Sequence, residues 1–228
     1  MKLTWLGHAS WRLEIEDQVL LIDPWLDGNP MMADQDVVAA TAGATQILVT
    51  HGHFDHVNGL AAFSAAAGVP VNGIVELEGH LVAQGAVSGH GFNKGGTVVF
   101  GGVRVAMVPA CHSSSIGEKG FYAGAPVGFM ITGEGKTIYF SGDTGIMADM
   151  AWMGELYRPE IGVLCAGGYY TMGMAEAAYA AKTYFNFKTV IPQHYKTFPA
   201  LEQSADALVA ALPGVTVIAP EVMVALDL

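Results

Sequence analysis

The chain has 228 residues, of which 52% are hydrophobic, and this length and composition favour one α/β domain with a well-filled core. Ten lysine and arginine residues stand against 21 aspartate and glutamate residues, and the resulting net charge of −11 argues against nucleic acid as a partner. Two cysteines cannot form a disulfide framework, and neither a signal peptide nor a membrane-spanning apolar run is apparent, so we expect a soluble, cytoplasmic protein without stable membrane insertion.

Short β-branched and aliphatic runs bounded by Gly, Asp or Pro predict strands along the chain. In chain order these strands cover Leu3–Leu6, Trp11–Ile15, Val19–Ile22, Ile47–Thr50, Val103–Val108, Val127–Ile131, Thr137–Phe140 and Ile161–Leu164. Alanine-rich stretches with helical spacing predict helices between some of them. The predicted helices cover Leu60–Ala67, Ile74–Gln84, Met147–Tyr157, Met174–Tyr184 and Ser204–Leu212.

The order of these elements predicts the architecture. Hairpin-like pairs dominate residues 3–22 and 97–140, whereas helices and strands alternate elsewhere. That order indicates a mixed α/β (α+β) fold with two mixed sheets covered by helices. No linker, charge block or repeat of fixed period marks a boundary, so we expect a single domain over residues 1–228.

A dense group of candidate metal ligands follows the predicted strand that ends at Thr50. His51, His53, Asp55 and His56 lie within six residues, with Gly52 available for a tight bend. Imidazole nitrogen and carboxylate oxygen suit zinc and related divalent ions. A polar turn with idle histidines is the alternative, but such a spacing rarely arises by chance.

Further candidate ligands are needed, because a catalytic zinc usually takes three protein ligands and leaves one position open. His112, Asp143 and His194 each follow an apolar run and sit beside small or turn-forming residues. The sequence therefore indicates seven candidate ligands, enough for two sites.

With these motifs the chain resembles the metallo-β-lactamase superfamily, whose fold is a four-layer αββα sandwich with the metals at one edge of the two sheets. The resemblance spans nearly the whole chain and is closer to a branch of bacterial and archaeal metal-dependent hydrolases. That branch also resembles ascorbate-phosphate lactonases and acylethanolamine-phospholipid phosphodiesterases. The motifs that carry it are Leu6–Ser10, Ile22–Leu26, Gly95–Thr97, Cys111–Ser114 and His194–Pro199.

The resemblance implies a role for each candidate ligand. His51, His53 and His112 would hold one metal, Asp55, His56 and His194 would hold the second, and Asp143 would bridge the two. Two divalent cations of this kind lower the pKa of a bridging water, and the resulting hydroxide would attack a small ester, lactone or phosphodiester. Asp55 would also orient the water. Zinc is the expected metal, with Mn²⁺ or Fe²⁺ as alternatives.

For several residues near these ligands, the sequence indicates a functional role less strongly. His8 lies in a turn at the expected metal mouth, where a role as proton donor or substrate ligand competes evenly with a structural hydrogen bond. Asp23 would support the metal-binding loop through hydrogen bonds, with an ordinary Asp-Pro turn as the alternative. Tyr195 and Lys196 are weak candidates for contact with a leaving group.

Other residues of chemical interest favour structural roles. His80 is expected on a helix beside Glu76, and His90 in a glycine-rich turn. Both cysteines, Cys111 and Cys165, are expected to be small buried apolar groups. Asn93 and the following glycines should form a turn, since a phosphate loop would need a Gly-Lys-Ser/Thr ending. Methionines in 147–153 and 172–174 favour core filling over a pliable pocket.

Three rival functions remain at this point. A redox di-iron protein of the same fold is disfavoured because histidine stands at position 53, where the redox members have glutamate. An RNA-processing zinc phosphodiesterase is disfavoured by the acidic charge balance. A purely structural metal site is disfavoured because it would normally leave no open position. The expected partner is a small-molecule substrate, and the sequence leaves open whether the chain forms a homo-oligomer.

Overall fold

The computed structural model describes all 228 residues and contains two seven-stranded sheets. The first sheet is built from the N-terminal part of the chain and its last strand, and it begins with an antiparallel meander of three strands, as the hairpin pattern predicted. The strands after the meander pair in parallel. In spatial order the sheet contains β16 (Ala225–Asp227), β1 (Lys2–Trp5), β2 (Trp11–Ile15), β3 (Gln18–Ile22), β4 (Gln46–Leu48), β5 (Val71–Ile74) and β6 (Ser88–Phe92).

The second sheet is antiparallel through its first four strands in the chain and parallel from β12 onward. A short separate hairpin leaves this sheet between β8 and β11 and consists of β9 (Ser115–Ile116) and β10 (Phe121–Tyr122). In spatial order the sheet contains β15 (Thr216–Val217), β14 (Thr189–Gln193), β13 (Ile161–Cys165), β12 (Lys136–Phe140), β11 (Val127–Gly133), β8 (Val103–Pro109) and β7 (Thr97–Phe100).

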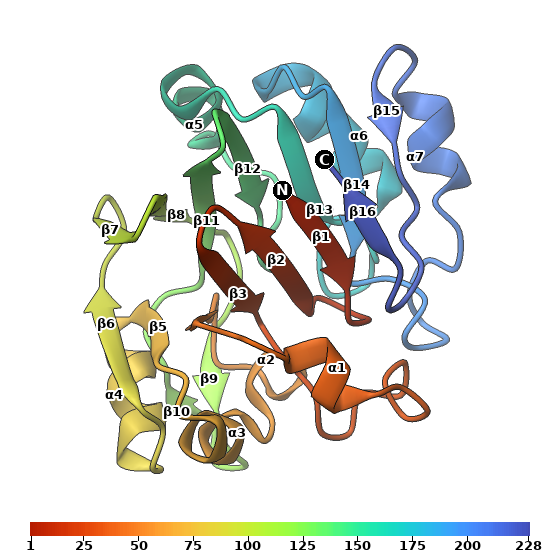
Figure 1. The fold of residues 1–228 in the computed structure, drawn as a ribbon. Helices are drawn as coiled ribbons and strands as arrows, with labels where there is room; N and C mark the ends of the chain where they lie inside the picture. The colour runs from red at the N-terminus through yellow and green to blue at the C-terminus, as the bar shows by residue number, and fades with distance from the viewer.

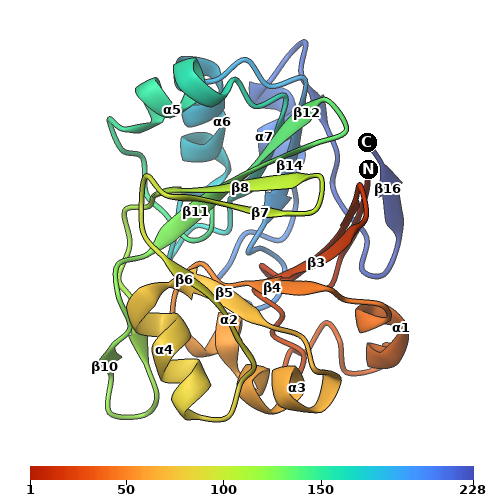
Figure 2. The same cartoon turned by 60° about the vertical axis from the view of Figure 1, so that its left-hand side comes forward.

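Helices cover the outer face of each sheet and complete four layers. The first sheet is covered by α1 (Val37–Thr41), α2 (Phe54–Val57), α3 (Leu60–Ala67) and α4 (Val75–Ala83), and the second by α5 (Met150–Tyr157), α6 (Met174–Tyr184) and α7 (Asp206–Ala211). Figure 2 shows the helix, sheet, sheet, helix order, which confirms the predicted αββα sandwich. None of these helices combines the length and apolarity that a bilayer crossing requires.

The core lies between the sheets and under the outer helices. Strand β2 shows why these residues form a strand with one face inward: Trp11, Leu13 and Ile15 are buried, whereas the residues between them are half-buried. A cluster of 58 buried hydrophobic residues runs from Leu3 to Leu212. Met150, Met153, Met172 and Met174 belong to it, so core filling is the role of these methionines.

Three strands of the first sheet, β5, β6 and β16, were not predicted, and the role expected of one residue in β6 was wrong. His90 lies in β6, exposed at the sheet edge, so the expectation that it sits in a turn was wrong. Residue Ile74 likewise ends β5, and the helix that was expected to start there begins at Val75. Glycine-rich β6 has the composition of a loop, but a Cβ at Gly89 would lie 2.5 Å from Asn72 Oδ1, so close packing against β5 requires glycine there.

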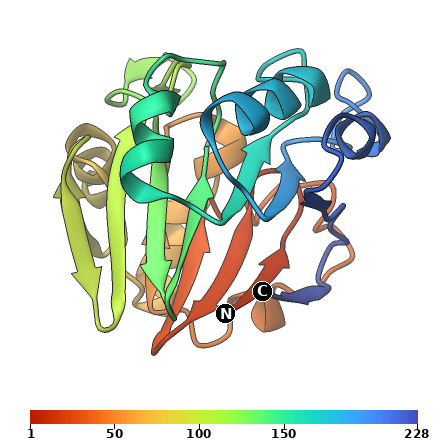
Figure 3. The same cartoon turned by 90° about the horizontal axis from the view of Figure 1, so that it is seen from above.

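Strand direction brings six loops to one edge of the sandwich. In the first sheet β1, β3 and β4 run the same way, because β2 is antiparallel to both of its neighbours and β3 pairs in parallel with β4. In the second sheet β8, β12 and β14 share a direction for the same reason. Figure 1 shows the two sheets. The chain termini lie close together in Figure 3, because β1 pairs with β16.

Candidate metal centre

The predicted site residues follow the carboxyl ends of these six strands. Because the carboxyl ends meet at one edge of the sandwich, residues far apart in the sequence come together there. His8 follows β1, Asp23 follows β3, His51 follows β4, His112 follows β8, Asp143 follows β12 and His194 follows β14. Asp55 and His56 lie on the short helix α2, with His53 at its N-cap position.

The backbone is constrained at this edge. Of nine residues other than glycine with positive φ, three belong to the site, namely His8 at 54°, Asp23 at 45° and His194 at 60°. L-amino acids occupy this left-handed region only at a cost, and such residues concentrate where the surrounding structure holds a functional geometry. At these three residues the backbone therefore turns sharply directly after the strand.

Asp143 lies at the centre of the cluster and is buried. Its Oδ2 atom is 3.0 Å from His194 Nε2, 3.4 Å from His56 Nε2, 3.7 Å from His112 Nε2 and 3.9 Å from His51 Nε2. A single carboxylate oxygen therefore faces four imidazole nitrogens from three parts of the chain.

Two groups of potential ligands surround this carboxylate, and a third group, His51, His56 and Asp143 itself, spans them. His51, His53 and His112 form one, with His51 Nε2 3.0 Å from His53 Nδ1. Asp55, His56, His194 and also His8 form the other. Within each group the candidate ligand atoms all lie within 4.8 Å of one another, a spacing that could surround one ion. These are the two sets of three that the resemblance implied, with His8 added to the second.

Asp23 orients histidines of both groups. Its Oδ2 accepts hydrogen bonds from His56 Nδ1 at 2.8 Å and from the Thr50 hydroxyl at 2.6 Å, and its Oδ1 accepts from the Thr50 backbone N–H. Since the Thr50 hydroxyl donates to Asp23, its oxygen accepts from His51 Nδ1 at 3.0 Å. The Nε2 atoms of His51 and His56 are thereby left facing the cluster, which is how a carboxylate prepares imidazoles as metal ligands. Asp23 therefore has the supporting hydrogen bonds that were expected of it.

His8 is fully buried and both of its ring nitrogens have partners. Burial and the neighbouring His194 lower the pKa of His8 to about 4, so its ring is neutral at pH 7. The Nε2–H group then donates to Asp55 Oδ2 at 2.9 Å, and Nδ1 accepts from the Thr197 hydroxyl at 2.9 Å. This arrangement favours the structural hydrogen bond, one of the two alternatives that the sequence left open.

The carboxylates determine the protonation of two other histidines. Burial alone would lower the pKa of His194, but Asp143 outweighs burial and raises that pKa to about 9. The pKa of His56 is raised well above its ordinary value, because Asp143 and Asp23 together outweigh its burial. Burial would raise the pKa of Asp143, yet His194 and His56 hold it well below its usual range. The carboxylate and the two imidazoles therefore form a buried ionic group when no cation is bound.

The donor set of this cluster fits divalent cations. His56 Nε2 and Asp143 Oδ1 are buried and make no hydrogen bond, and unpartnered buried polar atoms are costly. Cations among these atoms would satisfy them. Five imidazoles and two carboxylates, with no thiolate among them, match the ligand preferences of zinc and its neighbours.

A cleft of about 930 Å³ opens onto the cluster. Its inner wall includes His53, Asp55, His112, Asp143 and His194, and from there it extends along α2 and α3 to the β9–β10 hairpin. This volume lies in the range of cavities that enclose small-molecule ligands. The candidate ligands therefore border a space that could admit a substrate.

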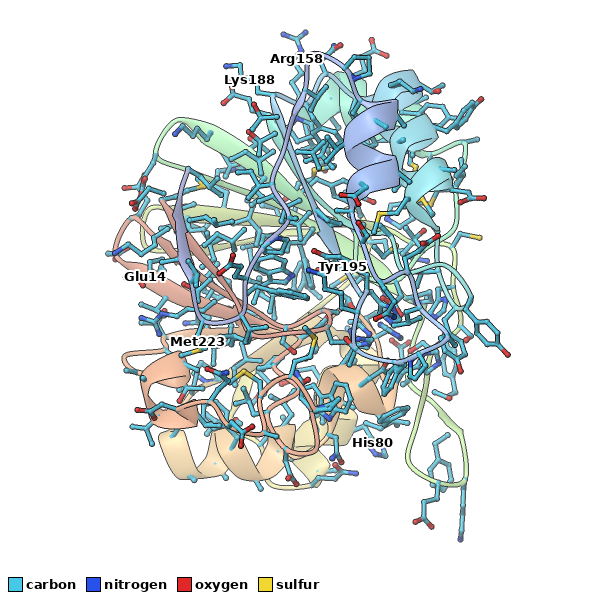
Figure 4. The ribbon with its side chains drawn as sticks, turned by 90° about the vertical axis from the view of Figure 1, so that its right-hand side faces the viewer. Glu14, His80, Arg158, Lys188, Tyr195 and Met223 are labelled. Atoms are coloured by element: carbon cyan, nitrogen blue, oxygen red, sulfur yellow. The ribbon has the colours of Figure 1, made fainter.

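Tyr195, Lys196 and His80 do not line the cleft. Tyr195 is fully buried and stacks on Trp5 with ring centroids 5.5 Å apart, so contact with a leaving group is ruled out for it. Lys196 is exposed, with Nζ 5.1 Å from the centroid of the Tyr195 ring. Figure 4 labels Tyr195 near the middle of the view. The same figure places His80 on the lower part of the molecule, where its Nε2 contacts Gln84 Nε2 at 2.9 Å.

The two cysteines differ in their surroundings. Cys165 is buried in the core, where burial raises the pKa of its thiol to about 11, as expected for an inert apolar group. Cys111 is exposed, so the expectation of burial was wrong for it. It begins the loop that carries His112 out of β8, and its backbone faces inward to bond Thr144 and Gly145.

Two hydroxyl residues of the site were missed by the sequence analysis. Thr50 connects Asp23 to His51, and Thr197 holds His8. Threonines are common in loops, and only the position of Thr50 beside the first ligand was a signal. Thr197 meets a residue 189 positions away, a contact that no local pattern encodes.

Comparison with known proteins places the chain among metal-dependent hydrolases. Residues 18–195 match the family described as the beta-lactamase superfamily domain. The chain is 58% identical over 225 residues to a UPF0173 metal-dependent hydrolase of Paracoccus denitrificans, covering 98% of each chain. It is 56% identical over 230 residues to one from Cereibacter sphaeroides, covering 100% of each. A metallo hydrolase from the archaeon Ignicoccus hospitalis has a similar structure, with a TM-score of 0.85, 29% identity and coverage of 100% of this chain and 98% of that one.

Proposed function

Because the chain belongs to the beta-lactamase superfamily and is a metal-dependent hydrolase, we propose that it uses two zinc ions to hydrolyse a small ester, lactone or phosphodiester. The observation that carries this proposal is the position of Asp143, whose Oδ2 lies 3.0–3.9 Å from four imidazole nitrogens. A carboxylate in that place can serve two cations at once.

The seven ligands then divide as the resemblance implied. His51, His53 and His112 would hold one ion. Asp55, His56 and His194 would hold the other, and Asp143 would contact both. Paired divalent cations supply two kinds of chemistry, activation of water as a nucleophile and polarisation of the substrate oxygen.

The chain's own residues prepare the reaction in three ways. Asp55 stays ionised, since hydrogen bonds from His194 and His8 outweigh its burial and hold its pKa well below the usual range. It lines the cleft and can therefore orient an attacking water. Asp23 keeps His51 and His56 in the tautomers that ligands need. The surrounding core excludes bulk water, because His8, His51 and His56 are each fully buried.

A substrate screen of the protein in defined metal states tests this function. The protein is stripped with a chelator, reloaded with zinc or manganese, and assayed with p-nitrophenyl acetate, a γ-lactone and bis-p-nitrophenyl phosphate. We expect turnover of at least one compound only in the reloaded protein. Absence of turnover with both ions bound would overturn the hydrolase proposal, and iron-dependent visible absorption with redox activity would favour the di-iron alternative.

A further inference from the structure

The cleft that leads away from the metal centre has an apolar wall. Beyond the candidate ligands it is lined on one side by Ala61 and Ala62 of α3, together with Val57 and Leu60, which are buried and expose little surface. Ile116 of the β9–β10 hairpin lines it as well. Phe54 also lines it and is 64% exposed, so an aromatic ring forms part of its rim.

The charge of this lining is one-sided. None of the 20 lining residues is lysine or arginine. Outside the cluster of ligands, the ionisable side chains are the carboxylate of Glu118 and the phenol of Tyr170. Lys119 follows Glu118 in the hairpin turn but is exposed and does not line the cleft. Gln84, which contacts His80, lines the cleft. Figure 4 shows Arg158 and Lys188 at the opposite end of the molecule from His80.

A negative group placed along this cleft would therefore meet no cation. It would leave water for a cleft lined by aliphatic side chains and by the uncharged polar side chains of Asn58, Gln84, Ser113 and Ser115, beside the Glu118 carboxylate and in a protein with a net charge of −11. Only the metal centre itself could compensate an anionic charge. An apolar group of the same length would instead exchange contact with water for contact with aliphatic side chains.

From this lining we infer that the substrate carries an uncharged, apolar arm that lies along α2 and α3 under the β9–β10 hairpin and is attached to the reacting group at the metal centre. This rests on the proposed hydrolase function and narrows its substrate class to esters, lactones or phosphodiesters whose arm is aliphatic and uncharged. With an ester or lactone, water adds across the acyl–oxygen bond, the acyl carbon takes the hydroxyl group and the leaving oxygen takes the proton. Phosphate or carboxylate groups on the arm are excluded.

A matched pair of esters tests the inference in the zinc-loaded protein. p-Nitrophenyl hexanoate and mono-p-nitrophenyl adipate have arms of equal carbon number, but the second ends in a carboxylate. We expect kcat/KM to rise about threefold to fourfold per methylene from acetate through butyrate to hexanoate. We expect the adipate ester to be slower than the hexanoate ester by roughly tenfold or more. Equal rates for this pair would overturn the inference.

Two lysine substitutions on α3 locate the arm. Ala62 is exposed and lines the cleft, whereas Ala67 is exposed on the same helix and does not line it. Ala62→Lys should lower the preference for hexanoate over the adipate ester by about fivefold, the effect of one partly exposed charge pair. Ala67→Lys adds the same charge and should leave the preference unchanged. Equal effects of the two variants would place the arm elsewhere.

A binding measurement separates this inference from the hydrolase proposal. Ligand-observed NMR should detect binding of hexanamide to the wild type and to Ala67→Lys, and weaker binding of hexanamide to Ala62→Lys. Adipamate, the analogue that ends in a carboxylate, should show no binding to the wild type. If this pattern holds while no ester, lactone or phosphodiester is cleaved, the hydrolase proposal fails and the apolar arm stands. If adipamate binds as well as hexanamide, the inference fails whatever the activity.

Discussion

At the scale of single residues, Asp23 lies outside the proposed ligand set but orients proposed ligands of both metals. One carboxylate accepts from His56 directly and from His51 through the Thr50 hydroxyl, so it sets the orientation of one proposed ligand of each metal. Its φ of 45° is also one that asparagine tolerates. Replacement by asparagine therefore changes the hydrogen bonding with little effect on the backbone.

Asp23→Asn should lower zinc affinity by about tenfold to a hundredfold, the usual cost of losing a supporting carboxylate. The amide nitrogen would face His56 Nδ1 and favour the tautomer whose Nε2 carries a proton and cannot bind a metal. Competition with a fluorescent zinc chelator measures the affinity. Asp34→Asn, an exposed carboxylate elsewhere in the same loop region, is the matched control. Unchanged affinity in Asp23→Asn would show that the network has no influence on the metals.

Asp143 and His8 should give different phenotypes on substitution by alanine. Asp143→Ala removes the group that faces all four imidazoles, so at least one ion should be lost and turnover should fall with it. His8→Ala removes a hydrogen bond to Asp55 and should reduce turnover with most of the metal retained. Elemental analysis alongside the assay separates the two. Full turnover and two ions in Asp143→Ala would remove the central ligand from the proposed site.

The candidate ligands were predictable because their chemistry is visible in the residue types. Four potential ligands within His51–His56 are hard to reconcile with an ordinary polar turn, and His112, Asp143 and His194 each stand at a strand end. The hydrogen bonds that orient them depend on tertiary contacts. Thr197 reaches His8 across 189 positions, a contact that periodicity and spacing cannot indicate.

At the scale of elements, the loop between β4 and α2 depends on a close approach. The sequence suggested that Gly52 permits a tight bend, but its φ is not positive. The need for glycine is one of space, since a Cβ there would lie 2.6 Å from Ala123 Cβ and 2.9 Å from Ser115 O. The loop that carries His51 and His53 is thereby packed directly against the base of the β9–β10 hairpin.

Gly52→Ala should destabilise the protein by about 1–3 kcal/mol, the usual cost of overpacking against neighbours that cannot move aside. Gly79→Ala on α4 provides a control of opposite sign, because no atom lies within 4 Å of its added Cβ. There alanine should stabilise the helix by about 0.5–1 kcal/mol. Chemical denaturation measures both. A neutral Gly52→Ala would mean that the hairpin base yields easily.

Elements with strong periodicity were predicted with their bounds. Trp11–Ile15, Leu60–Ala67 and Met174–Tyr184 begin and end in the structure where the pattern placed them. The strands β5 and β6 were missed because Asn72 and three glycines interrupt their apolar pattern. Asn72 is buried there and its side chain bonds Gln46 and the Ile47 carbonyl, so a tertiary contact replaces the missing propensity.

At the scale of the whole molecule, stability should depend on pH in opposite ways with and without metal. The pKa of His194 is about 9 in the metal-free fold, against an ordinary value of 6.5. A raised pKa adds stability that is complete below pH 6.5 and is lost as the pH rises through 9. Bound metal needs neutral imidazoles, so its contribution grows with pH instead.

The difference in Tm between zinc-loaded and metal-free protein should therefore widen from about pH 6.5 to about pH 9, the interval between the ordinary and raised pKa values of His194. Scanning calorimetry at several pH values, with metal content checked at each, measures it. His194→Gln should reduce the decline of the metal-free protein over this range, and His56, whose pKa is also raised, should account for the decline that remains. A metal-free Tm that rises across the same interval would contradict the assigned protonation of the buried cluster.

The central structural claim is that one chain binds two metal ions around Asp143. Elemental mass spectrometry of chelator-stripped protein titrated with zinc and freed of excess metal tests it most directly. We predict saturation at about two ions per chain, because two groups of imidazoles share one carboxylate. Saturation at one ion per chain would contradict the dinuclear site.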